Sequence, residues 1–200
     1  MAAIETLANG LIENWAVWFI SIVLIVAAVI DGVLLKVPNW LTYPVIFAGW
    51  IYAGIAFGWA GLGYSMLGTF VGLGLLLPAY AIGGMGSGDV KLLAGVGAWM
   101  FVMLEQAALE LSTPFAMLWA FGISTVIGAL MSVAMVLISG KWRKHYLQFF
   151  YILHEIRTVK NPEKLAAIAA ERKSTMMLLP YGIPIAIGTV LYFAWMGMLI

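Results

Sequence analysis

The sequence predicts an all-α fold, a polytopic membrane helix bundle of about six transmembrane helices with both chain termini outside the cell. Composition is the first reason, because 64% of the 200 residues are hydrophobic and 10% are charged, whereas soluble domains carry roughly 25% charged residues. The second reason is a series of apolar runs, most of them near the length of about 20 residues that crosses a bilayer. The run 90–104 is shorter and could begin nearer Gly86 or continue toward Leu109. The third is that Lys and Arg all fall on one side of the resulting topology. We therefore expect one membrane-embedded domain over residues 1–200.

Separate apolar runs are the candidate membrane spans. They cover residues 11–30, 40–58, 63–83, 90–104, 114–139 and 176–200. No Lys or Arg precedes the first run, so we expect it to be retained as a helix and not removed as a signal peptide. Small residues four positions apart also predict close packing between helices. The pairs are Gly54 with Gly58 and Gly68 with Gly72.

The orientation of the bundle follows from its basic residues. Successive connections alternate between the two sides of the membrane, and one side receives every Lys and Arg of the chain. By the positive-inside rule, that side is predicted to be cytoplasmic, and the opposite side carries acidic residues without basic ones. The basic residues are Lys36, Lys91, Lys141, Arg143, Lys144, Arg157, Lys160, Lys164, Arg172 and Lys173.

The segment 141–175 is predicted to be a basic, amphipathic helical segment on the cytoplasmic membrane surface. Aromatic and aliphatic residues recur in it at helical spacing, opposite charged and polar ones. A second short helix is expected after Asn161, which is a favoured N-cap residue. Binding of anionic membrane lipid and docking of a substrate both remain open as its role. His145 and His154 lack metal-ligand spacing and the chain has no Cys, so no metal site is predicted.

Two aspartates stand at the cytoplasmic ends of apolar runs. Asp89 directly follows Gly86, Ser87 and Gly88 at the expected start of a helix, where Asp is a common N-cap; alone, it fits a cap as well as a catalyst. Asp31 is expected at the end of a helix, where the helix dipole disfavours negative charge, so a structural role explains it poorly. The two aspartates together indicate a paired-carboxylate site.

Two neighbouring carboxylates are suited to the activation of water. One ionised Asp takes a proton from water while its protonated partner polarises a peptide carbonyl, which requires different proton affinities at the two positions. Because the N-terminus of a helix stabilises negative charge, Asp89 is predicted to be the base and Asp31 the acid. The glycines before Asp89 would let an extended substrate backbone approach closely.

The residues around both aspartates resemble the motifs of the type IV prepilin leader peptidases, which are membrane aspartic proteases. The stretch that ends in Asp89 is similar to the G-x-G-D motif of that family, and the stretch after Asp31 is similar to its first-aspartate segment. Residues 180–184, Pro-Tyr-Gly-Ile-Pro, resemble its last-helix pattern. The motif residues that flank the two aspartates are Gly86, Ser87, Gly88, Lys91, Lys36, Pro38 and Asn39.

The resemblance implies an endopeptidase that cleaves the leader from a prepilin at the cytoplasmic face of the inner membrane. It implies that Asp31 and Asp89 are catalytic and that the seven flanking motif residues support the site or bind substrate. The expected partners are a prepilin with a basic leader and an apolar helix, and membrane lipids; no metal, cofactor or nucleic acid is expected. The larger members also methylate the new pilin end and carry paired cysteines, which are absent here. The chain therefore looks like the short, peptidase-only branch of Flp-type (tight adherence) pilus systems.

Two alternatives from other classes remain open. Presenilin and signal peptide peptidase proteins share the G-x-G-D aspartate, but their partner aspartate follows Tyr, whereas Asp31 follows Ile30. Their Pro-Ala-Leu motif is also missing from the sequence. A small transporter or an assembly scaffold could use the Asp pair as a proton or ion relay. Transporter sites usually lie near the membrane midplane, and both aspartates are predicted at one face.

Overall fold

The computed structural model describes residues 13–81, 84–140, 142–159, 161, 164, 167–168, 171 and 179–199. Within these residues the protein is helical and contains no strand. The predicted all-α, polytopic helix bundle is confirmed, since four helices are long and apolar enough to cross a membrane and a fifth apolar helix is shorter. The helices are α2 (Trp15–Leu34), α3 (Asn39–Ala81), α4 (Ser87–Gln106), α5 (Thr113–Ser139), α6 (Trp142–Thr158) and α8 (Gly182–Trp195).

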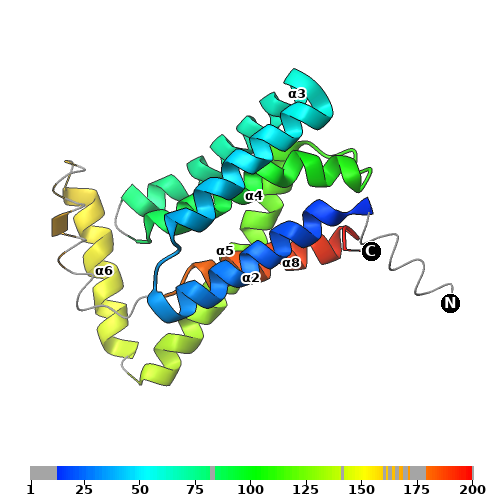
Figure 1. Cartoon of the computed structure of the whole chain (residues 1–200). Helices are drawn as coiled ribbons and strands as arrows, with labels where there is room; N and C mark the ends of the chain where they lie inside the picture. Colours follow the sequence, from blue (N-terminus) through cyan, green and yellow to red (C-terminus); the bar gives the residue numbers. More distant parts are fainter. Residues whose placement is uncertain are drawn as a thin grey trace, which may run out of the picture.

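The long helix α3 is a hairpin of two helical arms. Gly58 interrupts it with φ 67° and ψ −158°, a conformation that glycine adopts readily because it has no Cβ. Figure 1 shows the two arms running side by side in opposite directions. The Trp50 indole N–H donates to Thr69 Oγ1 across them at 2.9 Å. The arms correspond to the predicted spans 40–58 and 63–83, but the chain turns at Gly58 and not at the expected residues 59–62.

The number of membrane crossings stays a prediction. With α3 counted as two arms, the apolar helices follow the six predicted spans in order. The last of them, α8, has 14 residues in Gly182–Trp195 and is shorter than the predicted span 176–200. Residues 176–178 and 200 fall outside the part of the chain that the structure describes.

Helix α4 forms the centre of the bundle, and glycines allow it to approach α3 closely. A Cβ added at Gly68 would overlap the backbone of Gly97, and one added at Gly72 would lie 2.6 Å from the Leu93 carbonyl oxygen. The prediction of close packing is therefore correct for Gly68 and Gly72. It is wrong for Gly54 and Gly58, which serve the α3 hairpin: no atom lies within 4 Å of a Cβ built at Gly58.

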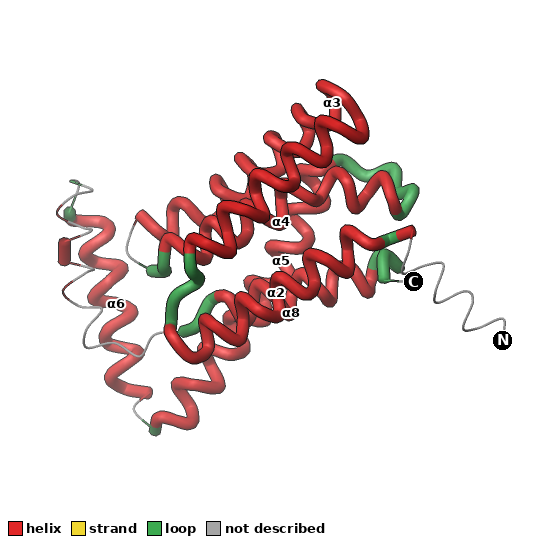
Figure 2. The backbone as a smooth tube through the Cα atoms, viewed as in Figure 1, coloured by secondary structure: helices red, strands yellow, loops and turns green. Residues whose placement is uncertain are grey.

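Helices α2, α5 and α8 form a second layer beside α3 and α4. Figure 1 shows α2 and α8 side by side, and α5 packs on α8 where Gly188 meets the Ser124 backbone. The loop between α2 and α3 and the loop before α4 lie at one end of the bundle, as the green segments in Figure 2 show. This arrangement brings the segment after Asp31 next to the segment before Asp89.

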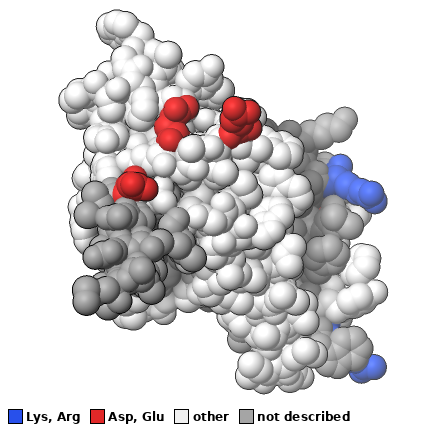
Figure 3. All heavy atoms as spheres, turned by 90° about the vertical axis from the view of Figure 1, so that its right-hand side faces the viewer, with Lys and Arg blue, Asp and Glu red and all other residues white. Residues whose placement is uncertain are grey.

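Charges separate between the two ends of the bundle. Figure 3 views the end nearest the chain termini, where acidic side chains gather and basic ones appear only at the rim. At the other end, Lys36 follows α2 and Lys91 lies in the first turns of α4. The separation of acidic from basic side chains, on which the predicted orientation depends, is thus present along the bundle axis.

Helix α6 accounts for the first half of the predicted amphipathic segment 141–175. It is amphipathic, and apolar side chains such as Tyr146, Leu147 and Phe150 remain exposed, as expected for a helix that lies on a membrane surface. His154 is exposed. The second short helix, and most basic residues expected in it, fall mainly on residues outside the described ranges.

Candidate active site

Asp31 lies in the last turn of α2 and is buried, with 2% of its surface exposed. Its Oδ2 accepts a hydrogen bond from the Gly182 backbone N–H at 2.7 Å. The helix was expected to end at Asp31 and Gly32 but continues to Leu34, because Leu35 adopts a left-handed conformation and donates its N–H to the Asp31 carbonyl. The side chain is therefore held from α8 and is not part of the helix cap.

Asp89 is the third residue of α4 and is also buried, with 6% of its surface exposed. Asp89 was expected at the N-cap, but Gly86 occupies the N-cap position. The Asp89 Oδ2 accepts the Gly86 N–H at 3.1 Å, which is one half of a capping box. The cap interpretation therefore accounts for one oxygen of this carboxylate and leaves a chemical role open.

Gly88 lets the start of α4 touch the loop that follows Asp31. A Cβ at Gly88 would overlap the carbonyl oxygen of Val37 and lie 3.0 Å from the Val37 Cβ. Any larger residue would push the two segments apart. The second glycine of the G-x-G-D motif in this chain thus meets a packing requirement between the two aspartate segments.

Lys91 and the Pro38–Asn39 pair hold α4 against α3. The Lys91 Nζ donates to Asn39 Oδ1 at 2.9 Å and lies 4.9 Å from the centroid of the Tyr43 ring. The Pro38 carbonyl accepts the N–H groups of Leu41 and Thr42 at the start of α3. These contacts position the aspartate segments, and none of them is made to the carboxyl group of Asp31 or Asp89.

Gly182 contacts Asp31 through its N–H, and its neighbour Tyr181 lies within electrostatic range of Asp89. Residues 180–184 stand out in the sequence as a motif, but no role was predicted for them. The Pro-Tyr-Gly-Ile-Pro pattern was the available signal, but the contact joins residues 151 positions apart, so only the packed bundle reveals it.

A polar cavity of about 560 Å³ opens beside Asp89. Most of the predicted motif residues line it, together with Tyr80 and Met85. The motif residues in its wall are Lys36, Asn39, Gly86, Ser87, Gly88 and Asp89. The structure thus gathers six predicted residues at one cavity, whereas Asp31, Pro38 and Lys91 are outside its lining. Asp31 is instead held by the Gly182 N–H.

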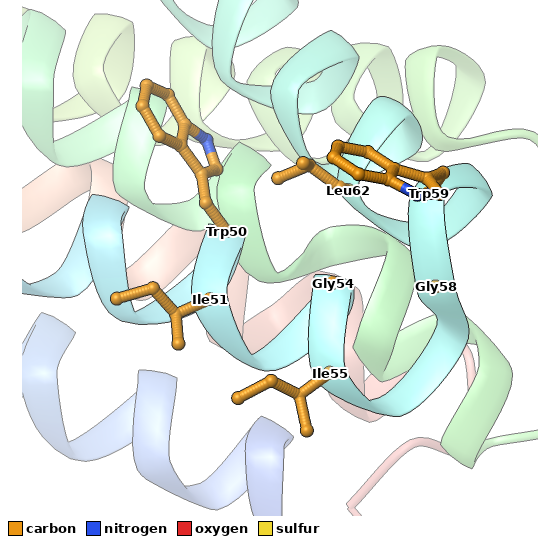
Figure 4. Close-up of a pocket in the computed structure, with 7 residues that line it drawn as sticks. All are labelled: Trp50, Ile51, Gly54, Ile55, Gly58, Trp59 and Leu62. Carbon is orange, nitrogen blue, oxygen red and sulfur yellow. The ribbon is translucent and has the colours of Figure 1, made fainter.

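A second cavity of about 510 Å³ lies at the Gly58 turn, at the opposite end of the α3 hairpin. Figure 4 shows Trp50, Ile51 and Ile55 projecting from the first arm, and Trp59 and Leu62 projecting from the second. Its lining contains no carboxylate, hydroxyl or imidazole. The polar cavity is therefore the better candidate for chemistry. Among the described residues, no group of three or more His, Cys, Asp and Glu side chains could hold a metal ion.

The fit of Gly182 against Asp31 makes a specific prediction. A Cβ at Gly182 would lie 3.0 Å from both the Cβ and Oδ2 of Asp31, so Gly182→Ala is expected to displace the carboxylate. We expect activity at this site to fall by up to about 10²-fold, since a misplacement of about 1 Å has that effect on catalysis. The measurement is the turnover rate of the purified variant, compared with that of the purified wild-type protein. Gly122→Ala is the matched control, because nothing lies within 4 Å of a Cβ there; equal rates for both variants would show that Gly182 does not position Asp31.

The sequence is similar to those of known leader peptidases. A family model described as the type IV leader peptidase family matches residues 18–138, a range that includes Asp31 and Asp89. The prepilin leader peptidase/N-methyltransferase of Aeromonas hydrophila is 30% identical over 145 residues, which cover 69% of this chain and 45% of that protein. The chain thus spans about half the length of this curated relative. No solved structure gives a significant match.

Proposed function

Because the chain belongs to the type IV leader peptidase family, we propose that it is a membrane aspartic endopeptidase that cleaves the leader peptide from a prepilin. The observation that carries this proposal is that two buried aspartates lie in segments that touch each other, where Gly88 meets Val37, at one end of the bundle. Two carboxylates that share a water molecule can hydrolyse a peptide bond without a metal or a covalent intermediate. Asp31 and Asp89 are the residues that we assign to this chemistry.

The proposed roles of the two aspartates follow from their helix positions. Asp89 lies in the first turn of α4, next to free N–H groups and the positive end of the helix dipole, which stabilise a carboxylate anion. It acts as the base that removes a proton from water as the water oxygen attacks the scissile carbonyl carbon. Asp31 lies at the negative end of α2 and carries the proton that polarises the carbonyl oxygen. Collapse of the tetrahedral species returns a proton from Asp89 to the departing amine.

The transporter and scaffold alternatives find less support. Both aspartates lie at the end of the bundle where the α2–α3 loop and the loop before α4 meet, and not halfway along it. A relay across the membrane would need further buried charges along its path. In the described residues, Asp31 and Asp89 are the only buried ionisable carboxylates.

The proposed setting is the inner membrane, with the site facing the cytoplasm. Lys36, Lys91 and helix α6 are at the end of the bundle that holds the aspartates, and basic residues mark cytoplasmic connections. A prepilin substrate with a basic leader and an apolar helix, of the Flp (tight adherence) type, is the proposed partner. No cysteine occurs in this sequence, so the paired cysteines of the larger members have no counterpart in it, and methyl transfer is not proposed.

The orientation can be tested with single cysteines, because the chain has none of its own. Cysteine at Lys164, which is exposed, is expected to be protected in intact cells from an impermeant thiol reagent. Cysteine at Glu110, exposed after the end of α4, is expected to react. Both should react once the cells are opened. Labelling of the Lys164 position from outside would reverse the orientation and place the aspartates on the wrong side for a cytoplasmic leader.

Direct cleavage tests the proposed function. Purified protein in detergent is mixed with a prepilin that has a basic leader and an apolar helix, and the products are identified by mass spectrometry. We expect two fragments that meet at the leader boundary, with no requirement for added metal. If several such prepilins stay intact with folded protein, while chelation or metal addition makes no difference, the endopeptidase proposal is wrong.

A further inference from the structure

An open groove runs along the bundle between the second arm of α3, helix α5 and helix α8. Its volume is about 350 Å³. Its wall includes Leu76 and Ala79 from α3, Thr125 and Ala129 from α5, and Pro184 from α8. The groove therefore lies along the apolar, membrane-spanning part of the helices and opens to their outer surface.

The hydroxyl groups in the groove do not make it polar. Ser124 donates to the Ala120 carbonyl, Thr125 to Phe121, and Ser132 to Gly128. Ser124 Oγ also lies 3.4 Å from the Ile185 carbonyl oxygen of α8, so carbonyl groups of the protein satisfy the hydroxyl donors of α5. The α5 wall of the groove is consequently apolar toward an occupant, as a helix inserted in a membrane would require.

The groove ends at the candidate active site. Met85 lines both the groove and the polar cavity beside Asp89. Tyr181 also lines the groove, and it interacts electrostatically with Asp89. The apolar groove and the polar cavity thus share the Met85 side chain, and Asp89 lies in the wall of the cavity beyond it.

We propose that the α3–α5–α8 groove binds the apolar helix of the prepilin while the polar cavity receives its leader. The proposal rests on the proposed function and adds where the substrate lies. The enzyme presents first the apolar groove, then the junction at Met85, and then the polar cavity with Asp89 in its wall. This order matches the order of segments in the substrate, which is apolar helix, scissile bond and polar leader. A helix docked in this groove would deliver the bond at its end to Asp31 and Asp89.

A second apolar groove is the main competitor. It has a volume of about 560 Å³ and lies between α2 and α8, with Val29, Val33 and Ile187 in its wall. It shares no lining residue with the polar cavity. A helix in that groove would lie beside Asp31 but would not lead into the cavity with Asp89. A lipid chain fits either groove, but only a polypeptide that continues into the cavity uses the junction at Met85.

Cross-linking distinguishes these occupants, and the absence of native cysteine makes it clean. The full chain carrying Asp89→Asn, which is expected to retain uncleaved substrate, receives Ala129→Cys in the groove. Leu130→Cys is the matched control, because Leu130 is 62% exposed on the same helix and does not line the groove. Val29→Cys reports on the competing groove. The partner is a prepilin with one cysteine in its apolar helix, joined by a short bismaleimide in liposomes.

We expect a cross-linked product of enzyme and prepilin with Ala129→Cys. We expect no such product with Leu130→Cys or Val29→Cys. An adduct that forms mainly at Val29 would assign the substrate helix to the α2–α8 groove. Equal adducts at all three positions, or none at Ala129, would mean that lipid and not substrate fills the α3–α5–α8 groove. Either result overturns the inference.

Filling the groove gives an independent kinetic test in active protein. Ala129→Trp is expected to raise KM for the prepilin about 10-fold with kcat little changed, because it removes binding that is made before the chemical step. Leu130→Trp should leave both constants as in the wild type. If the wild type cleaves and Ala129→Trp matches it, the groove assignment fails and the proposed function stands. If the wild type itself cleaves no prepilin, the proposed function fails and this inference with it.

Discussion

Asp31→Asn is expected to abolish leader cleavage while the protein still folds and accumulates in the membrane. The Asn carbonyl oxygen can still accept the Gly182 N–H that now binds Oδ2 at 2.7 Å, so the contact between α2 and α8 is retained. What is lost is the exchangeable carboxyl proton that polarises the scissile carbonyl. Loss of a general acid or base lowers rates by about 10²–10⁴-fold, and we expect an effect of that size on kcat.

The measurement is the single-turnover rate of cleavage of a purified prepilin, with thermal unfolding followed in the same sample. An unfolding midpoint close to that of the wild type shows that the bundle is intact, and Gly122→Ala provides a second folded control. A folded Asp31→Asn protein that cleaves at the wild-type rate would remove Asp31 from the mechanism. The family motif would then need another explanation in this chain.

Much of the bundle can be predicted from the sequence because membrane-spanning helices need long apolar runs. The α3 hairpin shows where that reasoning stops. Two apolar runs in the sequence indicate the two arms but do not locate the turn between them, which depends on Gly58 adopting φ 67°. Sequence periodicity likewise cannot distinguish Gly68, which packs against Gly97, from Gly54, which does not need a close partner.

The meeting of the aspartate segments was predicted, but the way they meet was not. The alternation of connections and the one-sided basic residues place the end of α2 and the start of α4 on the same side of the membrane. The end of α2 was missed because Leu35, a residue that rarely adopts positive φ, has φ 51° and closes the helix there. The role of Gly182 was missed because a contact across 151 positions depends on how α8 packs against α2.

The strongest alternative explanation of the site is that Asp89 serves only to cap α4. Its Oδ2 accepts the Gly86 N–H and so caps α4, and a capping residue alone would be retained for stability without any chemistry. Replacement by Ala would remove both roles and could not separate them. Loss of an N-terminal cap costs about 1 kcal/mol of stability, which would complicate the interpretation of a lower rate.

Asp89→Asn separates the two roles and tests the central claim most directly. The Asn side-chain oxygen can still accept the Gly86 N–H, so the cap and the start of α4 are retained, but the amide cannot take a proton from water. The measurement is the rate of prepilin cleavage by the variant, compared with wild type at equal protein concentration. An unfolding temperature equal to that of the wild type shows that the variant is folded. We predict that the rate falls by about 10²-fold or more. Cleavage at the wild-type rate would show that Asp89 is only a helix cap and would contradict the two-aspartate mechanism.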